Sequence, residues 1–140
     1  MDDFRTIGSR CLALHLRRAA RRIGRLYDEA LRPVDLNNGQ FSLMAMLAAK
    51  DDWTMQSLAD ALGLDQSSLS AAVKPLMRRE LIQVSASAED RRVRTLGLTP
   101  TGRALVEEAR PLWHGAQDRA ESLLGAHAPD DIRAALRSLA

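Results

Sequence analysis

Apolar residues near the start of the chain recur at alternating steps of four and three. The positions that follow this spacing are Leu12, Leu16, Ala19, Ile23, Leu26 and Ala30. Residues at these intervals share one face of a helix, so the pattern predicts a long helix over residues 10–31 with a single apolar seam. Pro33 ends this helix, because the residue before a proline is pushed out of the helical conformation.

Two shorter helices are predicted next. Asn37, Asn38 and Gly39 form a loop and helix-start signal, and a mostly buried helix follows them. Thr54 then suits the N-cap position of a second helix, where its side-chain oxygen accepts from Ser57 or its neighbour. The buried stripe of that second helix consists of Met55, Leu58, Ala59 and Leu62.

A tight turn and a further helix come directly afterwards. Gly63 permits a positive φ at little steric cost, and Asp65 is a good N-cap. The apolar positions of the helix are Leu69, Val73, Leu76 and Met77. The opposite face is small, polar and basic, with Gln66, Ser67, Ser70, Ala71, Lys74 and Arg78. Pro75 removes a helical hydrogen bond, so we expect a kink there, or a break with a short final turn.

A two-stranded hairpin is predicted after this helix. Its first strand begins with Leu81, Ile82 and Val84. Residues 85–90 form a small polar loop, and the β-prone residues of the return strand are Val93, Thr95, Leu96 and Leu98. Two helices joined by a glycine turn and followed by a hairpin make a winged helix-turn-helix.

The last third of the chain is again helical. Thr99 and Pro100 predict a helix start, with Thr99 as N-cap and Pro100 at the first helical position. The apolar positions of this long helix are Leu105, Ala109, Leu112, Ala116 and Leu123. Pro111 should bend the helix and Gly125 should end it. A final short helix has as its apolar side Ile132, Leu136 and Leu139.

The predicted fold is therefore mostly α, with a small β-hairpin wing. By length the chain forms a single domain over 1–140. Within it, a winged-helix lobe covers 34–99, and helical regions cover 5–33 and 100–140. The outer helices carry more apolar seam than one small lobe can cover, so we expect them to form a dimerisation region that pairs two copies of the chain.

Composition excludes several classes of protein. Aromatic residues are only 4% of the chain while hydrophobic residues are 46%, which indicates an aliphatic core. No apolar run approaches the roughly 20 residues of a membrane span, and the N-terminus lacks the apolar segment of a signal peptide. The single cysteine rules out an internal disulfide and fits a reducing compartment. We therefore expect a cytoplasmic protein without membrane contact.

Catalytic and cofactor motifs are missing from the sequence. It contains no nucleophile–base pair at recognisable spacing, no Gly-rich phosphate loop and no paired carboxylates in an apolar setting. His15, His114 and His127 do not have the spacing of metal ligands. We therefore expect neither an enzyme nor a metal or other cofactor.

The exposed face of the helix after Gly63 is a candidate DNA-reading surface. Its small side chains leave room for a major groove and can meet base edges or phosphates, and the free N–H groups at its start favour a phosphate. An ordinary solvated face is the alternative, but the position after a helix and a glycine turn favours recognition. The candidate DNA contacts are Gln66, Ser67, Ser68, Ser70, Ala71 and Lys74.

The basic tip of the hairpin is a second candidate contact, because arginine heads suit a narrow, negative minor groove. The arginines concerned are Arg91, Arg92 and Arg94. Asp90 lies two residues before Arg92, close enough to hydrogen-bond it and fix its direction. A solvated loop is the alternative. The net charge of only +2 is weak support for a nucleic-acid partner, so the prediction rests on where the positive charges lie along the chain.

This stretch resembles the MarR family of bacterial transcription regulators. The matching segments are LADALGLDQSSLSAAVKPL, ELI, DRRVRTLGLT and GR, with YDEAL and QFSLM before them. The resemblance covers nearly the whole chain. It implies a homodimer with a triangular body that binds a palindromic operator in double-stranded DNA, most often as a repressor. It also implies release from DNA when a small ligand or an oxidant acts near the dimer interface.

By position, the resemblance assigns the minor-groove arginine to Arg92, oriented by Asp90 and by Asp65. The sequence departs from the family pattern at two places. Glu80 stands where the family usually has glycine, at a cost of about 1 kcal/mol if a positive φ is needed there. Pro75 confines the predicted base contacts to residues up to Lys74.

Three residues are candidates for sensing. Some members of the family sense peroxides through one cysteine of the N-terminal helix, and Cys11 lies about two residues earlier, which rotates it by roughly 200°. A buried or inert cysteine is the alternative. Tyr27 and Trp113 could line a cleft for a small-molecule effector, or they could be ordinary packing. The alternative to a regulator is an interaction module that holds a protein with the same winged-helix surface.

Overall fold

The computed structural model describes residues 3–140, so Met1 and Asp2 of the predicted domain lie outside the described residues. The helices of the described chain are α1 (Phe4–Arg10), α2 (Leu12–Leu31), the 3-10 turn η1 (Arg32–Val34), α3 (Asn38–Ala49), α4 (Met55–Leu62), α5 (Gln66–Arg78), α6 (Pro100–Ser122) and α7 (Pro129–Arg137). Its strands are β1 (Trp53–Thr54), β2 (Ile82–Ala86) and β3 (Arg94–Leu98). The prediction of a mostly α fold with a small β wing is confirmed.

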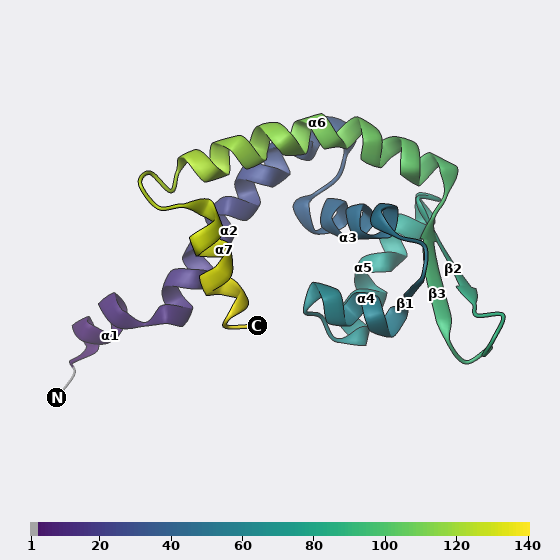
Figure 1. Ribbon diagram of the computed structural model, residues 1–140, viewed down its shortest axis with the longest axis horizontal. Coiled ribbons are helices and arrows are strands. Elements are labelled where there is room, and N and C mark those ends of the chain that lie inside the picture. The colour runs from purple at the N-terminus through teal and green to yellow at the C-terminus, as the bar shows by residue number, and fades with distance from the viewer. Residues whose placement is uncertain (1–2) are drawn as a thin grey trace.

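The elements form two groups joined by α6 (Figure 1). The bowed helix α6 runs across the top of the molecule, and α2 packs along its C-terminal half, while α7 descends from the end of α6. Helices α3, α4 and α5 and the sheet lie beneath the N-terminal half of α6. The wing tip therefore projects from the same side of the molecule as α4 and α5.

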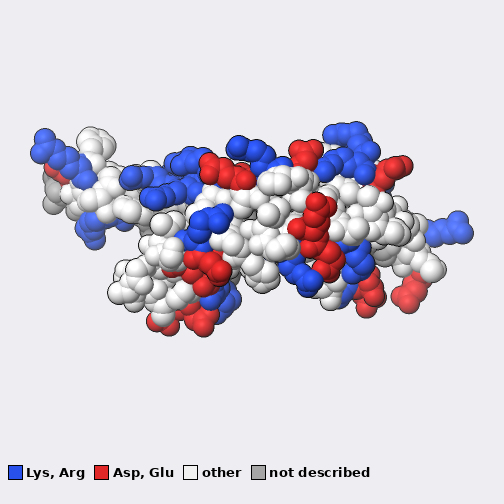
Figure 2. Space-filling view, turned by 90° about the horizontal axis from the view of Figure 1, so that it is seen from above, with Lys and Arg blue, Asp and Glu red and all other residues white. Residues whose placement is uncertain are grey.

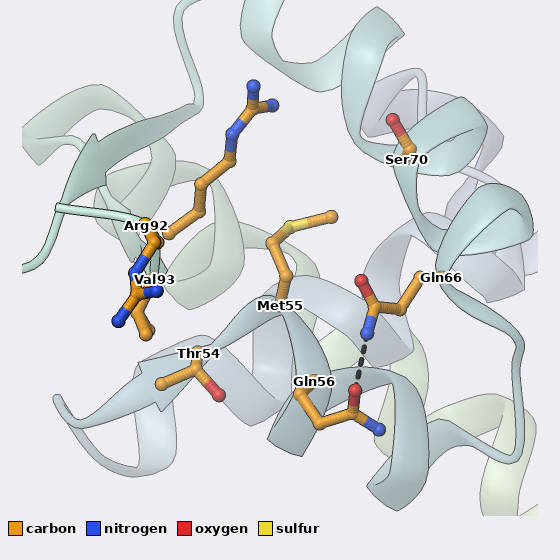
Figure 3. A pocket seen from close by; sticks show the side chains of 8 residues that line it. Thr54, Met55, Gln56, Gln66, Ser70, Arg92 and Val93 are labelled. Carbon is orange, nitrogen blue, oxygen red and sulfur yellow. Dashed lines mark hydrogen bonds between the residues drawn. The ribbon is translucent and has the colours of Figure 1, made fainter. Parts of the chain in front are cut away.

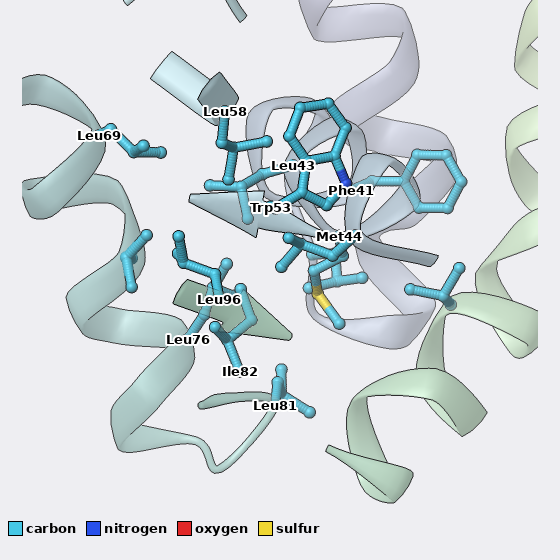
Figure 4. Packing of buried hydrophobic residues seen from close by; sticks show 14 of the residues in the cluster. Phe41, Leu43, Met44, Trp53, Leu58, Leu69, Leu76, Leu81, Ile82 and Leu96 are labelled. Atoms are coloured by element: carbon cyan, nitrogen blue, oxygen red, sulfur yellow. The ribbon is translucent and has the colours of Figure 1, made fainter. Parts of the chain in front are cut away.

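Aliphatic side chains hold the second group together (Figure 4). The largest fully buried side chains outside α2 come from α3, α4 and α5: Leu43, Met44, Leu47, Leu58, Leu69 and Leu76. The same core continues into Leu31 of α2 and Ala109 of α6, which are both fully buried. Burial of each such leucine is worth about 1.5–3 kcal/mol, so α5 is held rigidly on its inner face while its outer face remains free.

The wing is part of a three-stranded antiparallel sheet with the order β1-β3-β2. The predicted hairpin pairs Ile82 with Leu98 and Ala86 with Arg94. The short strand β1, which was not predicted, pairs Trp53 with Leu96 on the other edge of β3. The wing is thereby tied to the start of α4 as well as to its own hairpin partner.

One helix prediction was wrong, and one of the two alternatives at Pro75 is excluded. The helix predicted from residue 10 is interrupted at Cys11, whose extended backbone caps both α1 and α2. Asp3 gives α1 a start of its own by accepting from the Thr6 amide at 3.0 Å. We expected a kink or a break at Pro75, and the break is absent, since α5 continues to Arg78. The amide that Pro75 lacks would have bonded the carbonyl of Ala71, which is an exposed residue.

A tight backbone junction joins α5, the wing and α6. Glu80 has a φ of +57°, the left-handed conformation that ends α5, and the Leu81 amide donates back to the Leu76 carbonyl at 2.9 Å. The Leu81 carbonyl accepts from the Thr99 amide at 3.1 Å, and the Thr99 hydroxyl donates to the Glu80 carbonyl at 2.6 Å. Gly102 packs directly on this crossing, because a Cβ there would lie 2.0 Å from the Leu81 oxygen. The orientation of both α5 and the wing relative to α6 therefore depends on one crossing of the main chain.

Candidate nucleic-acid interface

The start of α5 is built by the turn before it. Gly63 has a φ of +67°, and Asp65 follows as the predicted N-cap. The Asp65 carboxylate accepts from the Ser68 amide at 2.7 Å and from the Ser67 hydroxyl at 2.9 Å. These bonds, the Ser68 amide first, hold the pKa of Asp65 below its ordinary value. The carboxylate is exposed, so it stabilises the helix start without a large desolvation cost.

The outer face of α5 is open, as predicted. Leu69, Val73 and Leu76 are buried against the core, while Met77, which was expected on the same face, is 42% exposed. Ser70 is half-buried, and the exposed members of the predicted set are Gln66, Ser67, Ser68, Ala71 and Lys74. These side chains are mostly short, so a duplex could approach the helix closely along this face.

The wing tip presents its arginines to solvent. Arg91, Arg92 and Arg94 are all exposed, and the Arg92 side chain is 92% exposed. The Asp90 carboxylate accepts from the Arg92 amide at 3.0 Å and from the Arg92 Nε at 3.3 Å. An exposed ion pair contributes little to stability, so this contact matters mainly for the direction of the guanidinium. The hydrogen-bond partners of Asp65 are Ser67 and Ser68, and its role in orienting Arg92 stays a prediction.

A groove separates α5 from the wing and brings the two predicted surfaces together (Figure 3). Its volume is about 400 Å³, and it is lined by Thr54, Met55, Gln56, Gln66, Ser70, Arg92, Val93 and Arg94. When a helix lies in the major groove and a wing in the adjacent minor groove, one sugar–phosphate strand passes between them. An open groove whose lining includes hydroxyl and amide side chains as well as two arginines suits that strand.

Three lining residues from the start of α4 were not predicted, namely Thr54, Met55 and Gln56. The Gln66 amide nitrogen donates to the Gln56 Oε1, which joins α4 to the first residue of α5 (Figure 3). Gln56 in turn donates to the Asp60 carboxylate at 3.2 Å. An exposed polar residue on α4 gives no sequence signal of its own, because its place in the groove depends on the angle between two helices.

The face of the molecule over α6 carries charges of both signs (Figure 2). Seen from above, over α6, lysine and arginine side chains are interspersed with aspartate and glutamate. Within residues 3–140, no group of three or more His, Cys, Asp or Glu side chains could hold a metal ion. No helix in that range is long and apolar enough to cross a membrane.

The predicted sensing residues fall into two places. Tyr27 is buried, with a hydroxyl that donates to Gln117, and burial together with the charge of Glu121 raises its pKa. The Trp113 ring lies 6.3 Å from the Tyr27 ring and 6.2 Å from the Phe41 ring. Cys11 lies at the far end of α2, about 24 Å from Tyr27 at the rise of an α-helix. The structure therefore does not bring Cys11 together with the aromatic pair.

A second groove, between α3 and α6, adjoins Trp113. It has a volume of about 360 Å³ and is lined by Phe41, Ala45, Ala48, Ala49, Val106, Glu107, Arg110, Trp113 and His114. Its floor is aromatic and aliphatic, while its rim is charged. Trp113 lines the groove as predicted, whereas Tyr27 is not among its lining residues.

The fold and sequence are similar to those of known transcriptional regulators. A sequence model of the MarR family matches residues 36–93. The HTH-type transcriptional regulator MhqR of Bacillus subtilis is 30% identical over 100 residues, which cover 71% of this chain and 69% of MhqR. The M. tuberculosis regulator MosR, solved in complex with DNA, has a TM-score of 0.84 and 35% identity over 92% of both chains. The transcriptional repressor CouR, bound to a 23-mer DNA duplex, has a TM-score of 0.78 and 31% identity over 99% of this chain and 96% of CouR.

Proposed function

Because this chain belongs to the MarR family of DNA-binding transcriptional regulators, we propose that it is a cytoplasmic, homodimeric repressor of a palindromic operator. The observation that carries the proposal is the groove with Gln66 and Ser70 on one wall and Arg92 and Arg94 on the other. The similar regulators MosR and CouR were solved bound to DNA, and CouR is a repressor, which supports the same reading here. The family and the fold are those of regulators rather than of enzymes.

Each part of the surface has a separate role in the proposed complex. The first two turns of α5 enter the major groove, where Gln66, Ser67, Ser70 and Ala71 meet base edges. Arg92 enters the neighbouring minor groove, aimed by Asp90, and is most important where A·T pairs narrow it. The phosphate contacts, which position the protein without reading sequence, come from Ser68, Lys74, Arg91 and Arg94.

A second copy of the chain covers the outer helices in the proposed assembly. Large apolar side chains of α1, α2 and the C-terminal segment are at least 46% exposed in a single chain: Phe4, Ile7, Leu12, Leu136 and Leu139. Apolar surface of this kind gains roughly 25 cal/mol for each Å² that a partner covers. The dimer places its two α5 helices about 34–36 Å apart, which is one turn of B-DNA.

Release from DNA is assigned to the groove between α3 and α6. A small aromatic or aliphatic acid matches its apolar lining, and its acid group would replace Glu107 as the ion-pair partner of Arg110. Because the groove lies between the lobe and α6, an occupant that separates α3 from α6 changes the distance between the two recognition helices. Oxidation of Cys11 is the alternative trigger, and it would act instead at the junction of α1 and α2.

The test of DNA binding uses charge removal at the groove. The double variant Arg92→Ala, Lys74→Ala should bind a genome-selected operator at least tenfold less tightly, with a shallower dependence of log K on log salt, because about two phosphate or groove charges are lost. The matched control is Arg103→Ala, Arg119→Ala, which removes two exposed charges from α6. Equal affinity of the first variant and wild type at moderate salt would refute the assignment.

The salt dependence also separates the regulator from an interaction module. DNA affinity should fall log-linearly and steeply as salt rises, since each neutralised phosphate releases a counterion. An interface of mixed charge with a protein would weaken much less over the same range. A nearly flat salt profile, with no enriched DNA sequence, would favour the interaction module.

A further inference from the structure

A chain of hydrogen bonds between three exposed side chains runs from α4 to the tip of α5. Gln56 and Asp60 lie one turn apart on α4, and the Gln56 Nε2 lies 3.2 Å and 3.4 Å from the two Asp60 carboxylate oxygens. The Gln66 Nε2 then donates to the Gln56 Oε1. Gln66 is the first residue of α5 and lines the groove between α5 and the wing.

The Asp60 carboxylate at one end of this series of hydrogen bonds decides which groups donate and which accept. A carboxylate can only accept hydrogen bonds, so Gln56 must turn its NH₂ group toward Asp60. The Gln56 carbonyl oxygen is then the atom that faces Gln66, so Gln66 donates to it with its own NH₂ group. As a result the Gln66 Oε1 points away from Gln56 and into the groove (Figure 3). One N–H of Gln66 remains available beside that oxygen.

We propose that Gln66 reads an adenine in each half-site, and that Gln56 and Asp60 are positioning residues that make it reject guanine. This inference rests on the proposed function as a DNA-binding regulator. In the major groove adenine offers the N6 donor and the N7 acceptor, which match one oxygen and one N–H of a glutamine amide. Guanine offers two acceptors, O6 and N7, so the outward Gln66 oxygen would face another acceptor.

The anchoring by Gln56 and Asp60 matters because a free glutamine amide can turn over. Unrestrained, Gln66 could rotate by half a turn and offer its NH₂ group to guanine. When Gln66 is hydrogen-bonded to Gln56, that rotation breaks the bond between them and brings their two Oε1 atoms together. A well-placed bidentate contact discriminates between bases by roughly 5- to 150-fold, so a fixed amide converts a permissive contact into a selective one.

The test compares base preference at one operator position among full-length variants. Selection from random duplexes with wild type and with Gln66→Ala identifies that position as the one that becomes degenerate in the variant. The ratio of Kd values for guanine and adenine at this position is then measured for wild type, for Asp60→Asn and for the double variant Gln56→Glu, Asp60→Asn. Asp52→Asn, an exposed site in the same lobe, is the control for the change of charge.

The expected wild-type preference for adenine is roughly 5- to 150-fold. Asp60→Asn should reduce it to about twofold, since an asparagine can donate to Gln56 and allow both glutamines to turn over. The double variant should restore it, because a glutamate at position 56 accepts from both Gln66 and the new asparagine without altering net charge. Asp52→Asn should keep the wild-type ratio even if all affinities rise.

Three results would overturn the inference. The position read by Gln66 could prefer a base other than adenine, Asp60→Asn could keep the full adenine preference, or the double variant could fail to restore it. A purely structural role of Asp60 would weaken binding to all sites alike and leave the ratio unchanged. If wild type enriched no sequence at all, the proposed function itself would fail, which is a different outcome from a lost adenine preference.

Discussion

Replacing Gly102 with alanine should destabilise the protein through a single close contact. A Cβ at this position would lie 2.0 Å from the Leu81 carbonyl oxygen and 2.9 Å from its carbon, both inside the 3.4 Å of ordinary contact. The two segments must therefore separate by about 1.4 Å at the oxygen, the difference between these two distances. That movement opens the two hydrogen bonds by which Thr99 holds Leu81 and Glu80.

The size of the effect follows from three contributions. Overpacking of a tight site costs about 1–3 kcal/mol, and each of the two weakened hydrogen bonds costs about 0.5–1.5 kcal/mol. Alanine regains up to about 1 kcal/mol over glycine because it is the better helix former. The balance, with the full regain subtracted, is a loss of about 1–5 kcal/mol in the free energy of unfolding.

The assay is urea unfolding, followed by circular dichroism at one protein concentration for all variants, because dimer stability depends on concentration. The matched control is Gly115→Ala in the same helix, where a Cβ would meet only Arg119 at an ordinary 3.6 Å. That variant should be unchanged or more stable, by up to about 1 kcal/mol. If Gly102→Ala were as stable as Gly115→Ala, the crossing would not be tight and the reasoning would be wrong.

Three further outcomes are expected. Glu80→Gly should raise the free energy of unfolding in urea by up to about 1 kcal/mol, because glycine adopts the φ of +57° without strain. Arg78→Gly inside α5 should lower it, and equal losses in the two variants would contradict this expectation. Folding lowers the pKa of Asp65, so the stability that its carboxylate contributes is complete above the ordinary pKa of 3.8 and is lost as pH falls through the lowered value. The difference in urea midpoint between wild type and Asp65→Asn should therefore vanish in acid, and a difference that stays constant with pH would contradict this expectation. Arg133 donates a hydrogen bond to Glu121 at 2.8 Å and lowers the pKa of that carboxyl. Arg133→Ala should therefore raise the pKa of Glu121 in an NMR titration, and an unchanged pKa would show that the pair does not persist in solution.

The parts of the fold that could be predicted depend on local signals. Asp65 bonds Ser68 and Thr99 bonds Gly102, each three residues ahead, so the caps can be recognised from short segments of sequence. Helical spacing predicts the buried Leu69, Val73 and Leu76 of α5, although it also predicted Met77, which is exposed. Glu80 was expected to be strained if its φ were positive, and the structure gives it that conformation.

The parts that could not be predicted depend on contacts between distant segments. Strand β1 has only two residues, and it exists because Trp53 pairs with Leu96 far along the chain. The hydrogen bond between Gln56 and Gln66 depends on the angle between α4 and α5, and the residue pattern does not predict that angle. At Pro75 a kink or a break was expected; the break is absent, and α5 continues through the buried Leu76 to Arg78.

The division of α5 into a buried face and an exposed face has a consequence for how such regulators diverge. Leu69, Val73 and Leu76 carry the packing, while Ser67 and Ala71 touch no part of the core. Substitutions at exposed positions usually change stability by less than about 0.5 kcal/mol. A descendant of this protein could therefore acquire a new operator by exchanging one or two of these side chains, and natural selection could explore such exchanges without first repairing the fold.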